Sequence, residues 1–420
     1  MRQFVRTPTG AALTLVGVAA ILVVAIGLTR APGSYAATSQ GAYAGPVEPV
    51  PTWTFTPTRP PQVVLAPTAT PTGTATPTAL PPTPTWTPAP TATPTPFIQP
   101  PQVAVTLTGL RHMWQTWNNC GPATLAMALS YYGSSLDQAD IAAVLRRHPD
   151  DKNVAPQELA DFARSQGYRA LVRVNGNAQL LRTFLSNGIP VVLETWLEPE
   201  PNDGMGHYRL LVGYDDAAQH WIAYDSYVSD NLVAPADAPY QGIYLSYAET
   251  EALWAVFNRT YILIYQETQE PLIQQILGEQ MDDAVMWQTA RQSAEAVVGQ
   301  RPDDPFAWFN LGTDLVALQD FDAAALAYDR ARALGLPWRM LWYQFGPFQA
   351  YHAVGRYGDV VALADATLAT TQSIEEIHYW KGQGLAGLGD LAGARAAWQQ
   401  ALSLNPAFAP AQEALASLPR

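Results

Sequence analysis

The chain has 420 residues, a formal net charge of −13 and a single cysteine. This length gives room for two or three domains. The acidic balance and the lack of any Lys/Arg-rich run argue against nucleic acid as a partner, because phosphate binding needs a clustered cationic face. Since one thiol forms no disulfide within the chain, Cys120 is either a small buried side chain or a reactive group.

Residues 1–36 have the pattern of a targeting segment. Arg2 and Arg6 precede an apolar run over about residues 11–28, which is close to the minimum for a membrane-spanning helix. Positive charge ahead of the run predicts that the rest of the chain lies outside the cytoplasm. Ser34-Tyr35-Ala36 is similar to a signal-peptidase site. The segment is therefore expected to be a single-pass membrane anchor, or a cleaved signal of a secreted protein, with the anchor favoured.

Residues 37–102 are expected to form a disordered stalk. Pro, Thr and Ala dominate this stretch, and large apolar residues are too few to bury a core. A polyproline-like chain rises roughly 3.1 Å per residue, so the stalk would hold the next domain on the order of 100 Å from the membrane. A plain spacer is the favoured role, although Thr-Pro repeats could also carry O-glycans.

Residues 103–266 are expected to form a globular domain in which helices precede strands. Periodicity and capping signals predict helices over residues 121–132, from a cap at Ser135, over 156–166, and between Asn177 and Gly188. Strand patterns follow at residues 189–194, 207–212, 220–224 and 261–265. Helices followed by strands are typical of an α+β fold.

Residues 282–420 are predicted to form an all-α solenoid. The helical pattern that begins at Phe321 recurs at Tyr357 and Leu391, at intervals of 36 and then 34 residues. In the first and third copies, small Ala residues would let paired helices approach, while Tyr328 and Trp398 fill the gap between them. The pattern resembles tetratricopeptide repeats, with a partial repeat before it and a cap at residues 411–418. The resemblance implies a surface that binds a protein partner or presents the substrate.

Cys120 is the candidate nucleophile. It lies where the polar loop of residues 115–119 enters the first predicted helix. The positive end of the helix dipole and the unpaired N–H groups there favour the thiolate, which is the reactive form. The same N–H groups can hold the oxyanion that forms when a thiolate attacks a carbonyl. A structural thiol fits poorly, because Asn118 and Asn119 precede Cys120 and Gly-Pro follows it.

A cysteine nucleophile needs a base, and histidine is suited to this role near neutral pH. Among six histidines, His207 is chosen because it begins a strand after the glycine-rich loop of residues 203–206. The start of one strand lies beside the end of the next strand in an antiparallel hairpin. Asp225, at the end of that next strand, is therefore predicted to orient the imidazole. Asp215 and Asp216 lie in the turn at the far end.

These residues resemble the motifs of bacteriocin-leader-processing cysteine peptidases and their stand-alone relatives, which are papain-like. The matching segments, within about residues 110–265, are Gln115-x4-Cys120-Gly-Pro-Ala-Thr, Gly206-His207-Tyr-x-Leu-Leu-Val-Gly-Tyr-Asp215 and Tyr224-Asp225. The resemblance implies that Cys120 is the nucleophile, His207 the base, Asp225 the orienting acid and Gln115 the side-chain donor to the oxyanion.

Three features depart from the family pattern. Gln115 lies five residues before Cys120, where many papain-like enzymes have six, so Asn118 or Asn119 could share its role. Ser226 replaces the proline that commonly follows the aspartate. No transporter domain accompanies the motifs, so cleavage of double-glycine leaders is not implied.

Two further motifs are interpreted as coincidental. Gly382-x-Gly384-x-x-Gly387 has the spacing of a dinucleotide fingerprint, but it lies within a repeat helix and follows no strand. Asn258-Arg259-Thr260 is a chance glycosylation triplet. No zinc or phosphate-loop motif is found, so no cofactor is expected.

The favoured function is hydrolysis of a peptide or isopeptide amide, outside the cytoplasm, through a thioester at Cys120. Removal of residues 282–420 is expected to leave hydrolysis of small peptides intact. Two alternatives stay open. The same triad could deamidate or transamidate side chains, or the domain could be an inactive peptidase-fold adaptor. The complete Cys–His–Asp set speaks against the adaptor.

Overall fold

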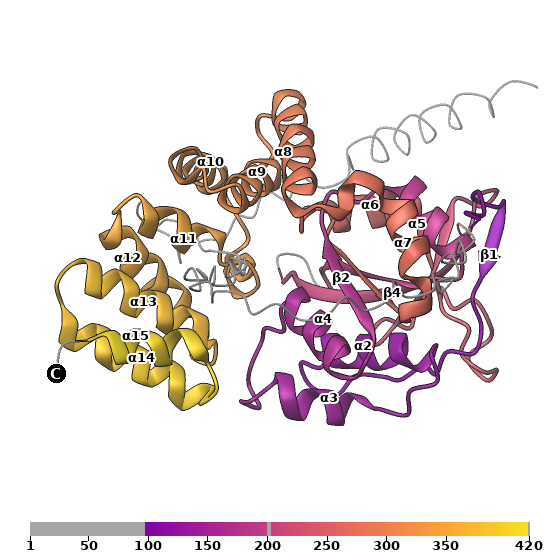
Figure 1. Ribbon diagram of the computed structural model, residues 1–420, viewed down its shortest axis with the longest axis horizontal. Coiled ribbons are helices and arrows are strands. Elements are labelled where there is room, and N and C mark those ends of the chain that lie inside the picture. Colours follow the sequence, from indigo (N-terminus) through magenta and orange to yellow (C-terminus); the bar gives the residue numbers. More distant parts are fainter. Residues whose placement is uncertain (1–96, 200–202, 419–420) are drawn as a thin grey trace, which may run out of the picture.

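The computed structural model describes residues 97–199 and 203–418. The predicted targeting segment and nearly all of the predicted stalk lie outside these residues. Within them, no helix combines the length and the apolar character needed to cross a membrane. The described chain has two lobes, one built around a sheet and one made of helices (Figure 1).

The first lobe contains a seven-stranded antiparallel sheet. Its strands are β1 (Ala104–Thr106), β2 (Arg169–Arg173), β3 (Val191–Leu197), β4 (Met205–Asp215), β5 (His220–Asp225), β6 (Ile243–Ser246) and β7 (Tyr261–Tyr265). Their order is β2-β7-β3-β4-β5-β6, with β1 paired to the second half of β4. The central strand β4 is the longest, and it carries His207 near its start.

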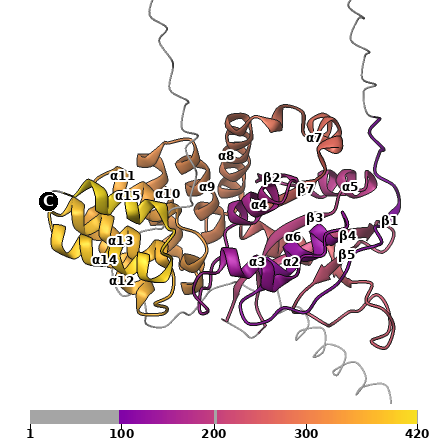
Figure 2. The ribbon, with the colours of Figure 1, turned by 60° about the horizontal axis from the view of Figure 1, so that its bottom comes forward.

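Helices cover both faces of this sheet (Figures 1 and 2). One face is covered by α2 (Cys120–Ser130), α3 (Gln138–Leu145) and α4 (Pro156–Ser165). The other is covered by α5 (Ala178–Ser186), α6 (Tyr247–Ala255) and α7 (Glu270–Leu277). Alternate residues of the strands point into the hydrophobic cores on the two faces of the sheet. Leu210, for example, packs on the α2 side and Leu211 on the α5 side. The α+β prediction is confirmed.

The start of α3 corrects one sequence prediction. The cap is Asp137 rather than Ser135, because Asp137 Oδ1 accepts from the backbone N–H groups of Ala139 and Asp140. Asp140 Oδ2 in turn accepts from the N–H of Asp137, so Asp137 and Asp140 form a capping box. Aspartate is as good a cap as serine, so the sequence alone does not separate the two.

The second lobe is an array of eight helices within the described residues. They are α8 (Asp283–Gln300), α9 (Pro305–Ala317), α10 (Phe321–Leu334), α11 (Gly346–Ala353), α12 (Tyr357–Leu368), α13 (Glu375–Gly387), α14 (Leu391–Leu404) and α15 (Ala409–Ser417). Short 3-10 helices η1 (Glu267–Gln269), η2 (Gly278–Met281) and η3 (Trp338–Trp342) connect the longer elements. The three predicted repeat starts, Phe321, Tyr357 and Leu391, are the first residues of α10, α12 and α14.

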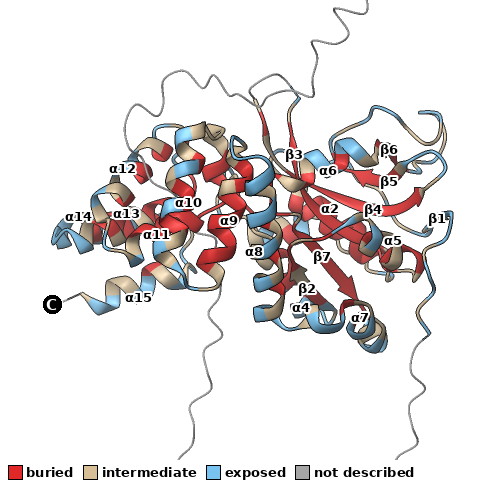
Figure 3. Cartoon of the chain, turned by 90° about the horizontal axis from the view of Figure 1, so that it is seen from above, coloured by how far each residue is buried: buried red, intermediate tan, exposed pale blue. Residues whose placement is uncertain are grey.

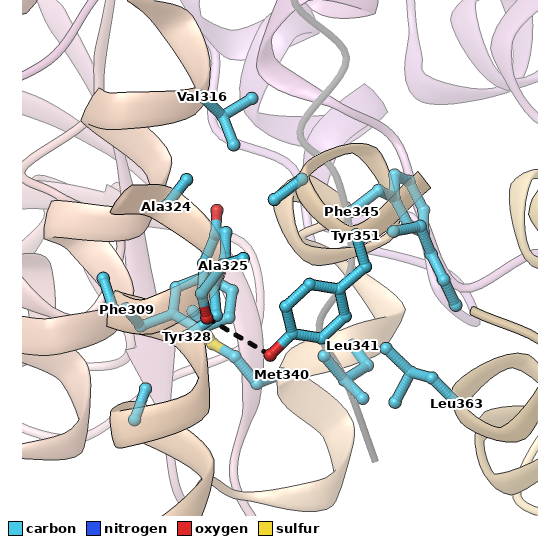
Figure 4. Packing of buried hydrophobic residues seen from close by; sticks show 14 of the residues in the cluster. Phe309, Val316, Ala324, Ala325, Tyr328, Met340, Leu341, Phe345, Tyr351 and Leu363 are labelled. Carbon is cyan, nitrogen blue, oxygen red and sulfur yellow. Dashed lines mark hydrogen bonds between the residues drawn. The ribbon is translucent and has the colours of Figure 1, made fainter. Parts of the chain in front are cut away.

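Aromatic rings fill the space between the paired helices of the array. The Tyr328 ring occupies the position that a Cβ on Gly312 would take, and Figure 4 shows it beside Phe309 in the core of the array. Tyr351 donates its hydroxyl to the carbonyl of Ala325 at 3.2 Å (Figure 4). Gly382 likewise faces the Trp398 ring, so the glycines of the apparent dinucleotide fingerprint serve helix packing.

The two lobes share one hydrophobic core. Trp196, Val256 and Phe257 of the first lobe belong to the same buried cluster as Phe306 and Phe309 of the array. Figure 3 shows buried residues both in the strands of the sheet and in α9. Two side-chain amides form hydrogen bonds across the joint between the lobes. Asn310 Nδ2 donates to the carbonyl of Ala255 at 2.7 Å, and Asn258 Nδ2 donates to Asp314 Oδ1 at 2.6 Å.

Asn258 therefore has a structural role. Its side chain is buried and its amide nitrogen is bonded to Asp314. A buried, hydrogen-bonded amide is not accessible to a glycosylating enzyme, because glycans are attached at the surface. The interpretation of this triplet as coincidental agrees with this position.

Candidate active site

Cys120 is the first residue of α2, and its side chain is partly exposed while the rest of the helix is buried. The first turn of a helix leaves backbone N–H groups without partners inside the helix. Gly121 packs closely on the Tyr208 ring, where an added Cβ would lie 3.4 Å from it. This contact presses the N-terminus of α2 onto β4, so the thiol is held beside the strand that carries His207.

His207 and Asp225 are in contact, as the hairpin geometry predicts. His207 Nε2 lies 2.9 Å from Asp225 Oδ1, and both side chains are buried. The direct cross-strand partner of Asp225 is Arg209, two residues after His207 on the same face of β4. Cys120 also acts on the imidazole of His207, through a side-chain hydrogen bond and through its charge. The structure thus brings Cys120, His207 and Asp225 into one chain of contacts.

The charge state of His207 follows from these contacts. Burial alone would lower the pKa of His207. The charge and hydrogen bond of Asp225, together with those of Cys120, outweigh burial and raise its pKa to about 9. The protonated imidazole, beside the Asp225 carboxylate, is therefore the favoured form of His207 at neutral pH.

Asp225 accepts more hydrogen bonds than the sequence indicated. Arg209 Nε donates to Oδ2 at 2.9 Å, and the backbone N–H groups of Tyr227 and Val228 donate to Oδ1 at 2.8 Å each. Burial alone would raise the pKa of Asp225, but the charge and hydrogen bond of His207, the charge of Arg209 and the Val228 N–H outweigh it and lower the pKa. The carboxylate is thus held ionised by its neighbours.

The turn aspartates lie elsewhere, as expected. Asp215 pairs with His220 across the β4–β5 hairpin and caps the turn by accepting from the N–H groups of Ala217 and Ala218. Asp216 forms an ion pair with Arg182 at 2.7 Å. Neither is a partner of His207.

Gln115 is anchored beside Asp225. Its N–H donates to the carbonyl of Ser226 at 2.8 Å, and its Oε1 accepts from Ser226 Oγ at 2.9 Å. Ser226, the residue after Asp225, thus fixes the amide of Gln115. Asn119 is committed elsewhere, because its Nδ2 donates to Thr116 Oγ1 at 2.8 Å and its Oδ1 accepts from Arg146 at 2.5 Å.

Glu194 is a site residue that the sequence did not indicate. It lies on β3 opposite Tyr208, one residue before the partner of His207. Its side chain is buried, and Oε2 has no hydrogen-bond partner among the described residues. Burial, and then the charge of Cys120, raise the pKa of Glu194 to about 8, so the carboxyl is protonated at neutral pH. Glu194 is placed near the site by the register of β3 against β4, and no short sequence pattern predicts that register.

His112 also lies near the site, although no motif supported it. Its Nε2 is 2.8 Å from the backbone carbonyl of Asp225, and its ring stacks on Tyr240 with centroids 3.5 Å apart. Burial lowers the pKa of His112 more than the carbonyl and charge of Asp225 raise it. The contact is with the backbone of Asp225, so His112 supports the strand end rather than the imidazole.

Comparison with protein families finds a match within each lobe. The family model described as "Peptidase_C39 like family" matches residues 107–253, which contain Gln115, Cys120, His207 and Asp225. The first lobe is a C39-like peptidase domain. A tetratricopeptide repeat model matches residues 375–408, which cover α13 and α14. The two resemblances noted in the sequence are thereby confirmed.

Solved structures are similar to parts of the chain at low identity. A C39-like peptidase from Bacillus anthracis is 17% identical, covering 39% of this chain and 98% of its own, with a TM-score of 0.31. The peptidase domain of Streptococcus ComA, a bifunctional ABC transporter involved in quorum sensing, is 16% identical, covering 38% and 100%, with a TM-score of 0.29. MamA from Desulfovibrio magneticus is 17% identical, covering 31% and 72%, with a TM-score of 0.28. No curated protein matches the chain.

Proposed function

We propose that the C39-like domain is a cysteine peptidase that hydrolyses peptide amides through a thioester at Cys120. The observation that carries the proposal is the chain of contacts from Asp225 through His207, both buried, to Cys120. A cysteine nucleophile, a histidine base and an acid that orients the base form the set that thiol-dependent acyl transfer requires.

Acylation would begin from the thiolate–imidazolium pair. The Cys120 thiolate attacks the carbonyl carbon, and the carbonyl oxygen becomes an oxyanion beside the N–H groups at the start of α2. His207 then gives its proton to the leaving amine, the C–N bond breaks, and a thioester remains on Cys120.

Deacylation would use the same residues in reverse. Neutral His207 takes a proton from water, and the resulting hydroxide attacks the thioester carbon. The C–S bond breaks, the carboxylic acid leaves, and the thiolate–imidazolium pair is restored. Asp225 keeps the imidazole oriented in both halves, because its Oδ1 holds Nε2 and its Oδ2 is fixed by Arg209.

Gln115 is the proposed side-chain donor to the oxyanion. With Oε1 held by Ser226, the amide keeps one orientation and its Nε2 group is left for a ligand. The commitment of both polar atoms of Asn119 favours Gln115 over that neighbour. Gln115→Ala should lower acylation by about 10²–10³-fold, the usual cost of losing one such donor.

Acylation by p-nitrophenyl acetate tests the reaction without knowledge of the natural substrate. The protein should release a burst of p-nitrophenolate equal to the concentration of Cys120, and Cys120→Ala should release none. Digestion of a mixed peptide library, followed by mass spectrometry, then separates the reaction types. New peptide termini support hydrolysis, whereas a gain of about 1 Da without cleavage would indicate deamidation. An absent burst would leave the adaptor interpretation.

We also propose that the tetratricopeptide array recruits a protein partner or substrate, and that residues 1–36 place both lobes outside the cytoplasm. The proposal on location is supported by Arg2, Arg6 and the apolar run that follows them. Protease treatment of intact cells should degrade both lobes if they are displayed outside, and should spare them if they are cytoplasmic.

A further inference from the structure

The helical array approaches the catalytic residues through one tyrosine. Tyr343 follows η3, between α10 and α11 of the array, and its ring lies against Gly206, the residue before His207. A Cβ added to Gly206 would lie 3.0–3.2 Å from three carbons of that ring. Only glycine leaves room for this approach without displacing the ring.

The charge of Cys120 acts on the phenol group of Tyr343. Burial raises the pKa of Tyr343, and the charges of Cys120 and Glu194 raise it further. The charge of Arg339 and the backbone N–H of Gly206 act in the opposite direction, but they do not cancel the rise. The hydroxyl is therefore neutral over the working range of a cysteine peptidase, so it is available as a hydrogen-bond donor.

Contacts from both lobes fix the position of Tyr343. Arg339 forms an ion pair with Asp203 at 2.5 Å and donates to the carbonyl of the same residue at 3.0 Å. The Arg339 guanidinium also stacks on Trp342, the neighbour of Tyr343, at 5.3 Å. The ring of Tyr343 packs edge-on against Phe257 of the shared core, with centroids 6.2 Å apart. The ring is thus held by residues on both sides of the joint.

Tyr343 and Gln115 lie beside the ends of different strands. Gln115 is anchored at the end of β5 through Ser226, whereas Tyr343 lies at the start of β4, near Glu194 of β3. Cys120 and Tyr343 are each partly exposed rather than fully buried.

We propose that Tyr343 is a substrate-binding residue of the peptidase, supplied by the helical array, whose hydroxyl donates a hydrogen bond to a backbone carbonyl of the bound peptide next to the scissile bond. This inference rests on the proposed peptidase function. It makes the array part of the catalytic site as well as a surface for partners. It concerns peptide substrates, because a small acyl group on Cys120 has no backbone carbonyl next to the scissile bond.

The test compares Tyr343→Phe with the native chain using three probes. Hydrolysis of an equimolar tetrapeptide–aminomethylcoumarin library should fall about 10-fold, the effect of one hydrogen bond of about 1.4 kcal/mol. The p-nitrophenyl acetate burst and the alkylation of Cys120 by iodoacetamide should not change, because neither probe has a peptide backbone. Tyr357→Phe, on a ring that packs against Gly387 within the array, is the matched control and should leave all three rates unchanged.

Each other outcome overturns the inference. Equal library hydrolysis by Tyr343→Phe and the native chain means that the hydroxyl does not bind substrate. An equal loss with all three probes means that Tyr343 only supports the fold. Faster library hydrolysis by Tyr343→Ala means that the array covers the site and inhibits it. If the native chain itself gives no burst and no library hydrolysis, the peptidase proposal fails together with the inference. If the native chain is active and only the result for Tyr343→Phe differs from expectation, the inference alone fails.

Discussion

At Asp225, one buried carboxylate accepts from His207, from Arg209 and from two backbone N–H groups. Asp225→Asn should slow the p-nitrophenyl acetate reaction by about 10³–10⁴-fold, because an amide presents the wrong partner to the imidazole. It should also destabilise the fold by about 3–5 kcal/mol, since the Arg209 guanidinium loses its buried counter-charge. Urea unfolding measures this second effect.

Asp215→Asn is the matched control for this substitution. The Asp215 side chain only accepts from two backbone N–H groups of an exposed turn, and an asparagine oxygen accepts equally well. Activity and stability should both stay close to native. A native rate for Asp225→Asn would show that another group orients His207.

His207 sets the expected pH dependence. Its pKa is raised from 6.5 to about 9, so the protonated imidazole stabilises the native fold fully below pH 6.5, and this contribution is lost as pH rises through about 9. Hydrolysis of the peptide library should decline over the same range, because imidazolium is the acid that protonates the leaving amine. A rate that declines near pH 6.5 instead would mean that Asp225 and Cys120 do not act on the ring.

At the scale of the elements, helix packing in the array depends on glycine. A Cβ on Gly382 of α13 would overlap the Trp398 ring of α14. Gly382→Ala should therefore lower the free energy of unfolding by about 1–3 kcal/mol, the usual cost of overpacking. Gly299→Ala in α8, where a Cβ meets no atom within 4 Å, should instead be neutral or raise it by up to about 1 kcal/mol. Thermal unfolding of the two variants compares them directly.

Elements with strong local signals are predictable from the sequence. The Asn177 cap, the Pro156 helix start and the apolar runs of β4 and β7 all appear close to their expected positions. The short strand β6 has four residues, one of them exposed, and gives no period to read. Strand β2 pairs only with β7, and arginines at both of its ends obscure its apolar centre.

Some residues of the candidate site are likewise predictable from local sequence patterns, and others are not. Cys120, His207 and Asp225 are found because a helix start, a strand start and a hairpin are local features of the sequence. The position of Glu194 depends on the register between two strands, and that of Tyr343 depends on how the array docks. No short pattern encodes either relationship, so these residues become visible only in three dimensions.

At the scale of the whole molecule, the shared core changes what truncation should do. Without residues 282–420, Trp196, Val256 and Phe257 would lose the aromatic residues that bury them. Each large side chain returned to water costs about 1.5–3 kcal/mol, so the truncated chain should aggregate or lose activity even on p-nitrophenyl acetate. The domain boundaries in the sequence had instead suggested that hydrolysis of small peptides would survive this truncation.

Removal of residues 409–420 alone is the control for this truncation. Helix α15 packs in a separate small cluster with Trp398 and Ala401, so the catalytic lobe should keep its core and its activity. Size-exclusion chromatography and the burst assay report both outcomes. A soluble, fully active fragment that ends at residue 281 would show that the joint contributes little.

Carboxyl groups gather where α13 meets the peptidase domain. Asp151 and Glu158 lie on one side and Glu375 and Glu376 on the other, and Asn153 Nδ2 donates to Glu376 Oε1 at 3.5 Å. Burial comes first among the causes that raise the pKa of all four, and the charges of neighbouring carboxylates add to the rise for each except Glu375. The cationic groups that act here are Arg146, on Asp151, and His148, on Glu375.

Stability should therefore fall with rising pH at this joint. A carboxyl group whose pKa is raised in the folded state favours folding most below its unfolded pKa, near 4.5, and the advantage is lost as pH rises toward the folded value, about 7 for Glu158. Glu376→Gln should raise the melting temperature at pH 7.5 and leave it unchanged at pH 4. Glu413→Gln on the exposed side of α15 should have no effect at either pH.

The single core that runs from Trp196 to Ile377 also limits how this chain could be lengthened or recombined. Helices α9 to α12 contribute to the cluster that buries Trp196, Val256 and Phe257, so exchanging them for foreign repeats would disturb the core of the first lobe. The cluster around Ala394, Trp398 and Ala411 is separate. New binding specificities could thus be added as extra repeats beyond α15, where the array grows outward and the catalytic lobe stays intact.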